Sequence, residues 1–178
     1  VLVATDHQSI YDHVMDFGGE VCMTSQQHPS GTDRCREAIE QLEHTCDFVV
    51  NIQGDEPFIQ PEQINRTLAP LIENPDAQIA TLAKKIPAAD MLRNPNFVQV
   101  VFARNGRALY FRRHPIPYVR DSAPEHWLEA GPFYKHIGLY AFRSEILQEV
   151  AKLSPSDLER MEGLEQLRWL ENGFSIEV

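Results

Sequence analysis

The segment Asp47-Phe48-Val49-Val50-Asn51-Ile52-Gln53-Gly54-Asp55-Glu56-Pro57 decides the fold. Its first half is short and mostly apolar, which is typical of a strand that is covered on both faces. Its second half becomes polar at Gln53, and Gly54 and Pro57 mark the end of the strand. A buried strand that ends in carboxylates is typical of an open α/β sheet, where ligands bind beyond the carboxyl ends of the strands.

The segments around this strand alternate between short apolar runs and amphipathic helices. Thr32 can cap a helix that precedes the strand, and Pro61 is placed at the first turn of a helix that follows it. Four runs are predicted strands in this first half, namely residues 1–4, 21–23, 47–52 and 79–82. The order β-α-β-α-β-α-β predicts a mostly parallel sheet with helices on both sides.

The second half has a different pattern. Asn105-Gly106, between apolar runs at 97–103 and 108–112, is a strong signal for a β-hairpin. Residues 114–134 carry four prolines and are predicted to be a loop. A strand at 136–142, helices at 144–153 and 158–171, and a last strand at 174–178 complete the predicted order.

Composition excludes several classes of protein. The chain has 178 residues, 43% of them hydrophobic and 24% charged, which predicts one folded globular domain. A formal net charge of −10 argues against a general nucleic-acid binder. The longest apolar runs are far too short to span a bilayer, and no signal peptide is visible, so we expect a cytoplasmic protein with no membrane partner. The three cysteines form no CxxC pair and indicate neither a disulfide framework nor a zinc site.

Two polar segments are candidates for ligand binding. Asp55 is placed at the end of a buried strand, where Mg²⁺ would share oxygen ligands with substrate phosphates; a solvated acidic turn is the alternative. Small donors in the turn Ser30-Gly31-Thr32-Asp33-Arg34, just before a helix, suit a phosphate, a sugar or a base edge. An ordinary loop with a capped helix explains the same turn.

Two further groups stand later in the chain. Clustered cations that include Arg113 and His136 invite a carboxylate or phosphate partner, although His136 in a strand is equally consistent with a hydrogen-bonded core histidine. Glu165 and Gln166 stand beside a leucine stripe on a predicted helix, and they face either a substrate or water.

Taken together, these segments resemble the CMP-Kdo synthetases, also called 3-deoxy-manno-octulosonate cytidylyltransferases. The resemblance covers nearly the whole chain. The residues that carry it include Ser30-Gly31-Thr32-Asp33-Arg34, Gln53-Gly54-Asp55-Glu56-Pro57, His136-Ile137-Gly138-Leu139-Tyr140 and Leu164-Glu165-Gln166-Leu167-Arg168. The family implies a Rossmann-like, GT-A-type three-layer sandwich with a mostly parallel sheet and a β-hairpin excursion that forms a homodimer.

The resemblance also implies a reaction and a site. CTP and Kdo would give CMP-Kdo and pyrophosphate, with Mg²⁺, for lipopolysaccharide biosynthesis. Asp55 would be the metal ligand, and Ser30, Gly31, Thr32, Arg34 and Gln53 would lie beside the nucleotide and sugar. Arg113, His136, Tyr140, Glu165 and Gln166 would line the Kdo pocket. Because such a transfer needs positioning and charge neutralisation, Mg²⁺ on Asp55 could replace a side-chain base, and Arg113 could pair with the Kdo carboxylate.

The sequence departs from the family in two places. The N-terminal loop that holds the CTP triphosphate and the C-terminal Asp-Thr-Pro-Glu-Asp segment with a second metal ligand do not occur in residues 1–178. We therefore expect a single nucleotidyltransferase domain that lacks these two segments, and no catalysis if nothing more exists. The alternatives are a CMP-sialic acid synthetase or another sugar nucleotidyltransferase, a non-catalytic sugar-nucleotide binding module, and a GT-A glycosyltransferase.

Overall fold

The computed structural model describes residues 1–178, which form eight strands, eight α-helices and one short 3₁₀ helix at Pro124–His126. The strands are β1 (Leu2–Thr5), β2 (Glu20–Met23), β3 (Phe48–Asn51), β4 (Ile79–Lys85), β5 (Gln99–Phe102), β6 (Ala108–Arg112), β7 (Tyr134–Arg143) and β8 (Ile176–Glu177). The helices are α1 (Gln8–Asp16), α2 (Gly31–Glu40), α3 (Pro61–Glu73), α4 (Ala89–Leu92), α5 (Trp127–Ala130), α6 (Ser144–Val150), α7 (Asp157–Glu162) and α8 (Gln166–Glu171).

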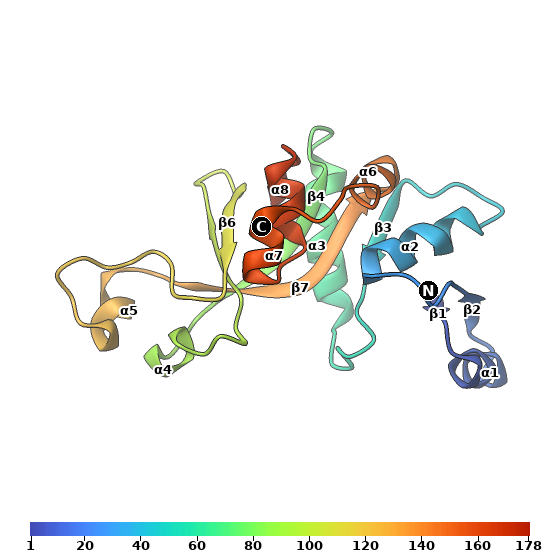
Figure 1. Ribbon diagram of the computed structural model, residues 1–178, viewed down its shortest axis with the longest axis horizontal. Helices are drawn as coiled ribbons and strands as arrows, with labels where there is room; N and C mark the ends of the chain where they lie inside the picture. The colour runs from blue at the N-terminus through green and yellow to red at the C-terminus, as the bar shows by residue number, and fades with distance from the viewer.

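The long strand β7 organises a six-stranded mixed sheet (Figure 1). It pairs antiparallel with β3, β4 and β5, and β5 pairs antiparallel with β6. In this sheet only the pair of β4 and β8 is parallel. The strands β1 and β2 form a separate, parallel two-stranded sheet. The α/β class is therefore confirmed, whereas the prediction of a mostly parallel sheet is wrong.

The position of β7 explains this error. β3 and β4 point the same way, as a crossover through α3 requires, but β7 lies between them and pairs with both. An apolar run shows that a strand is buried on both faces; it carries no information about which strand lies beside it. The neighbour in this case, Tyr134–Arg143, comes from a segment far along the chain from both β3 and β4.

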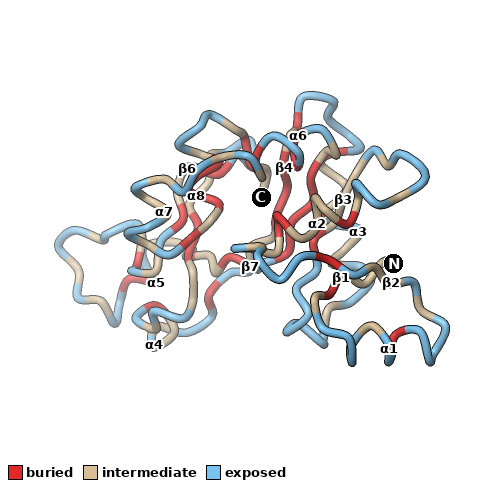
Figure 2. The backbone as a smooth tube through the Cα atoms, turned by 45° about the vertical axis from the view of Figure 1, so that its right-hand side comes forward, coloured by how far each residue is buried: buried red, intermediate tan, exposed pale blue.

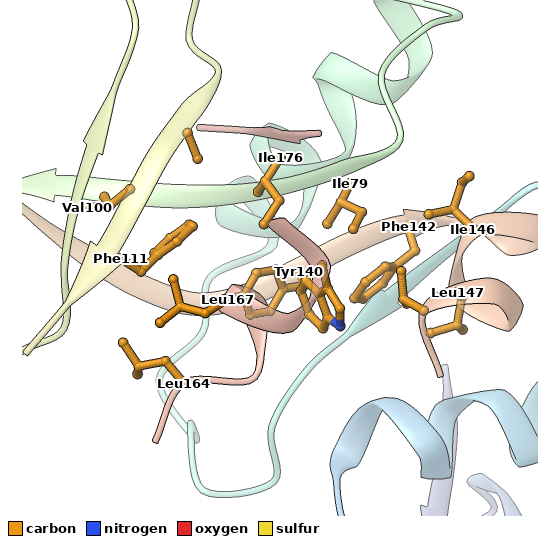
Figure 3. Packing of buried hydrophobic residues seen from close by; sticks show 13 residues of the cluster. Ile79, Val100, Phe111, Tyr140, Phe142, Ile146, Leu147, Leu164, Leu167 and Ile176 are labelled. Carbon is orange, nitrogen blue, oxygen red and sulfur yellow. The ribbon is translucent and has the colours of Figure 1, made fainter. Parts of the chain in front are cut away.

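Helices cover both faces of β4 and β7. On one face, Ile79, Tyr140 and Phe142 pack against Leu147 of α6 and Trp169 of α8 in the main core, whose side chains point toward one another in Figure 3. Alternate residues point to the other face, where Ala80 and Ala141 pack against Leu71 of α3. This alternation follows from the two-residue period of a strand, and it gives three layers at this position.

The two ends of the molecule extend away from this core (Figure 1). The predicted hairpin is confirmed as β5 and β6, which are joined at Asn105-Gly106, where Gly106 has a φ of +89°. Beyond it, α4 and α5 belong to an arm with a small core of its own, formed by Ile86, Leu92, Trp127 and Phe133. At the opposite end lie β1, α1 and β2. None of the helices has both the length and the apolar character that crossing a membrane would require.

Candidate active site

The start of α2 and the start of α8 meet through a carboxylate, although they are more than 130 residues apart in sequence. Ser30 caps α2 by accepting a hydrogen bond from the backbone N–H of Asp33. Its Oγ lies 2.6 Å from Asp33 Oδ2 and 3.0 Å from Glu165 Oε1, so its single proton is shared between two carboxylates. Thr32 Oγ1 donates to the other oxygen of Glu165 at 2.9 Å.

The end of β3 joins the same place. Gln53 Nε2 donates to Asn51 Oδ1 at 3.3 Å, and the Gln53 amide lies directly over Gly31. A Cβ added at Gly31 would come within 3.0 Å of Gln53 Nε2, so only glycine permits this close approach without a shift. The structure therefore brings together five predicted site residues, which are Ser30, Gly31, Thr32, Gln53 and Glu165.

Glu165 is the electrostatic centre of this cluster. Its side chain is 25% exposed, and removal from water raises its pKa. Hydrogen bonds from Thr32 and Ser30 and the positive charge of Arg168 lower that pKa, while the negative charge of Asp33 raises it again. A carboxylate has about four acceptor positions, so Glu165 can still accept hydrogen bonds from a polyhydroxylated ligand.

Tyr140 on β7 lies near enough to Glu165 for the charge of that carboxylate to act on its hydroxyl. Its ring packs against Trp169 and Phe142, and its hydroxyl is buried without a hydrogen-bond partner. Burial and the charge of Glu165 raise the pKa of the phenol well above its usual value, so the hydroxyl keeps its proton. An unpaired buried hydroxyl is costly, and a ligand that accepts its proton removes this cost.

His136 is a hydrogen-bonded core histidine. Its Nε2 lies 2.9 Å from Thr81 Oγ1, and its ring packs edge-on against Phe111. Burial, together with a smaller contribution from the positive charge of Lys135, lowers its pKa to about 3. The imidazole is therefore neutral at physiological pH, and any contact that it makes with a sugar acid is that of a neutral hydrogen-bonding group.

The two predicted site arginines are both committed to protein partners. Arg113 donates from Nε to Glu162 O at 2.7 Å, from Nη1 to Pro95 O at 3.2 Å and from Nη2 to Gly163 O at 3.1 Å. Arg113 thus fixes the turn between α7 and α8, just before Glu165.

Arg34 points away from Ser30 toward the N-terminal strands. It donates to Asp6 Oδ2 at 2.8 Å and to Thr24 Oγ1 at 2.5 Å, and it thereby ties α2 to β1 and β2. Neither arginine reaches the carboxylate of Glu165 in the structure.

The carboxylate proposed for the metal has a different environment. Asp55 lies exposed in the turn that follows β3, beside Glu56. The structure contains no group of three or more acidic, histidine or cysteine side chains that could hold a metal by itself. A single accessible carboxylate nevertheless fits Mg²⁺, because this ion is commonly held by one or two carboxylates together with substrate phosphates and water.

Sequence reasoning missed the residues behind the cluster. Asn51, which is buried at the end of β3, holds the Gln53 amide. Arg168 is buried and forms a two-pronged ion pair with Glu159. Arg168 stands in a segment that carries the family resemblance, but an arginine on a leucine-rich helix gives no sign in the sequence that it is buried.

Comparison with known proteins places this geometry in a class. A family model described as "Cytidylyltransferase" matches residues 1–176, so the chain belongs to the cytidylyltransferase family of nucleotidyltransferases. Within it, the relatives are 3-deoxy-manno-octulosonate cytidylyltransferases, which confirms the resemblance found in the sequence. The protein of that name from Cytophaga hutchinsonii is 54% identical over 177 residues, which cover 99% of this chain and 70% of the relative. That from Bacteroides thetaiotaomicron is 52% identical over 179 residues, with 99% and 71% covered.

A solved structure agrees with this placement. CMP:2-keto-3-deoxy-manno-octonic acid synthetase, which was solved in complex with CTP, is 39% identical and superposes with a TM-score of 0.90. The match covers 99% of this chain and 70% of that one. The mixed α/β sheet centred on β7 is therefore the fold of that synthetase.

Proposed function

We propose that this protein transfers the cytidylyl group of CTP to 3-deoxy-manno-octulosonate, giving CMP-Kdo and pyrophosphate for lipopolysaccharide biosynthesis. One observation carries the proposal. The three segments that the family resemblance assigns to the site converge on Glu165, Gly31 and Gln53, in a chain that is about half identical to 3-deoxy-manno-octulosonate cytidylyltransferases over almost its whole length.

The chemistry requires positioning more than covalent catalysis. The anomeric hydroxyl of the sugar acid attacks the α-phosphorus of CTP in line, and pyrophosphate leaves from the opposite side. Asp55 would hold Mg²⁺, which supplies charge neutralisation at the phosphates and acidifies the attacking hydroxyl when it is bound. Gly31 leaves room for the Gln53 amide, which we assign to the boundary between nucleotide and sugar.

We assign the sugar acid to the space beside Glu165. The carboxylate has acceptor positions left for sugar hydroxyls, Gln166 follows it at the start of α8, and the unpaired Tyr140 hydroxyl offers a proton. Arg113 uses three of its five N–H groups on backbone carbonyls, so two remain for the sugar carboxylate. An Arg113→Ala enzyme with unchanged affinity for Kdo would remove Arg113 from this assignment.

The proposal extends to fold and assembly. We place residues 1–178 in one nucleotidyltransferase domain of the GT-A-type, Rossmann-like architecture, and the helices on both faces of β4 and β7 support this. We further propose a cytoplasmic homodimer formed through the hairpin and arm, where Leu109 and Tyr118 are 61% and 75% exposed. Large exposed apolar side chains of this kind are enriched at interfaces. Sedimentation of Leu109→Glu and Tyr118→Glu variants as monomers is the expected result.

Pyrophosphate release from CTP and Mg²⁺, with and without Kdo, tests the function. The protein should release pyrophosphate only when Kdo is present, and Asp55→Asn should lower kcat by at least about a hundredfold. Glu56→Gln is the matched control, because it removes a neighbouring carboxylate that is also exposed and should leave activity near the parent value. Pyrophosphate release with sialic acid instead of Kdo would show that the substrate is sialic acid. No release with any sugar acid would indicate a non-catalytic binding module.

A further inference from the structure

Arg168 and Glu159 form a buried ion pair behind the site. The Arg168 side chain is 7% exposed and Glu159 is 15% exposed. Nε and Nη2 of the arginine donate to the two carboxylate oxygens at 2.8 and 2.6 Å, and Nη1 donates to Leu153 O at 2.8 Å. The guanidinium is thus held at three points, and its Nη2 lies 3.8 Å from Glu165 Oε1.

The pair belongs to the same hollow as the site. Arg168, Glu159 and Glu165 line one cavity together with Ser30 and Asp33. A buried ion pair adds little stability compared with apolar residues of similar volume, because removing two charges from water offsets their attraction. Stability alone therefore gives no reason for a fixed guanidinium beside Glu165.

Arg168 is the positive charge among the groups that act on Glu165, beside the hydrogen bonds from Thr32 and Ser30. Asp33 on α2 faces it with negative charge, and Cys35 on α2 and Tyr140 on β7 are neutral neighbours whose own ionisation Glu165 opposes. Glu159 on α7 is shielded from Glu165 by the arginine that it binds. Arg168 supplies the positive charge that favours an ionised Glu165 in this partly buried place.

We propose that Arg168, anchored by Glu159, is a positioning residue that keeps the Glu165 carboxylate ionised and directed at the hydroxyls of Ser30 and Thr32. This inference rests on the proposed function, in which Glu165 contacts the sugar acid. A protonated Glu165 would present one oxygen as a donor, so it could no longer accept from both hydroxyls and from a sugar hydroxyl.

The deciding variant is the double substitution Glu159→Met and Arg168→Met, which removes both charges and leaves neither partner buried alone. If the ion pair has only a structural role, this double variant should keep the parent pKa of Glu165 and the parent KM for Kdo. If Arg168 acts through Glu165, the loss of its positive charge raises the pKa of Glu165. The pH below which the KM for Kdo rises should then be higher in the double variant than in the parent, while the KM for CTP stays within about twofold of the parent value.

Two further variants complete the comparison. Arg168→Lys keeps the positive charge, so the pKa of Glu165 and the KM for Kdo should both stay close to their parent values. Arg143→Met is the control, because Arg143 is likewise held at three points, by the backbone carbonyls of Leu71, Asn74 and Ala77, but it forms no ion pair with Glu165. It should lower stability and leave both the pKa of Glu165 and the KM for Kdo unchanged.

The pKa of Glu165 is measured in the whole protein by carbon-13 NMR of glutamate side-chain carboxyls, assigned with Glu165→Gln. A double variant with the parent pKa and the parent KM for Kdo would overturn the proposal, and so would an equal change in Arg143→Met. If the double variant does not fold, Arg168→Gln gives the same comparison, because its amide can still donate to Glu159. A parent enzyme that does not use Kdo would refute the proposed function, and the NMR titration would still decide the role of Arg168.

Discussion

Two regions of this molecule share one sequence pattern and differ in what holds them together. The unit of β1, α1 and β2 and the sheet around β7 both read as short strands alternating with amphipathic helices. The strands of the first are mostly exposed or half-buried, as Figure 2 shows, and in residues 1–30 only Thr5 of β1, Val14 and Thr24 are buried. In the second, Ile79, Ala141 and Phe142 are fully buried. The pattern therefore predicts that strands and helices form, but not how much apolar surface they bury together.

The largest effect on stability is expected from truncating a core side chain in the sheet around β7. Trp169 is fully buried and packs edge-on against Tyr140 and Phe142. Trp169→Ala should lower the free energy of unfolding by about 3–5 kcal/mol, measured by urea denaturation. Phe17→Ala, which truncates an aromatic side chain that is 65% exposed at the end of α1, should cost less than about 1 kcal/mol. Equal losses would mean that the two regions do not differ in burial.

Acid should weaken the same region through His136. Burial lowers its pKa to about 3, below the usual 6.5, so the folded state favours the neutral ring. This stability is complete above pH 6.5 and is lost as the pH falls toward 3. At about 1.4 kcal/mol per pKa unit, the loss reaches about 4 kcal/mol by pH 3. Urea midpoints at pH 7, 5 and 4 should fall more steeply for the parent than for His136→Asn, and parallel curves would contradict the burial of a neutral imidazole.

A smaller and local effect is expected at the N-terminal unit. Arg34 joins α2 to Asp6 and Thr24, so Arg34→Met should release β1 and β2 from the rest of the molecule. Their amide protons should exchange at least about tenfold faster, since charge-assisted hydrogen bonds are lost, while β4 and β7 keep their protection. The control is Arg66→Met, which removes an exposed pair with Glu62 on α3 and should change neither region. Faster exchange throughout the molecule would show that the two regions unfold together.

The smallest effect on stability belongs to the junction between the two regions. Gly31→Ala places a methyl group about as close to Gln53 as side chains tolerate, and the flexible amide can move aside. We expect a loss below about 1 kcal/mol together with a raised KM for CTP or Kdo. Gly54→Ala, which meets nothing within 4 Å, is the control. If Gly31→Ala leaves the KM for both CTP and Kdo unchanged, the Gln53 amide is not part of the site.

The sequence predicted local features better than distant ones. The Asn105-Gly106 hairpin and most of the helices depend on neighbouring residues, and the structure has them. Two local predictions were wrong: Ser30, not Thr32, caps α2, and the helix predicted at 158–171 is divided at Gly163 into α7 and α8. The pairing of β7 with both β3 and β4 depends on residues far apart in the chain, and the prediction of a mostly parallel sheet was wrong.

The same limit applies to the site. Motifs indicated Ser30, Gln53 and Glu165, which the structure brings together. The burial of Arg168 and the carbonyl partners of Arg113 depend on tertiary packing, because a charged residue looks the same in sequence whether it is solvated or enclosed.

The place of β7 between β3 and β4 also sets the order of events during synthesis. Both strands leave the ribosome long before residues 134–143, so each waits with unpaired edges until its common partner is made. Closing that pairing joins segments up to about a hundred residues apart, which slows folding compared with locally paired sheets. Arg143, the last residue of β7, then binds the carbonyls at the end of α3. The C-terminal third of this chain thus completes the folding of the first half.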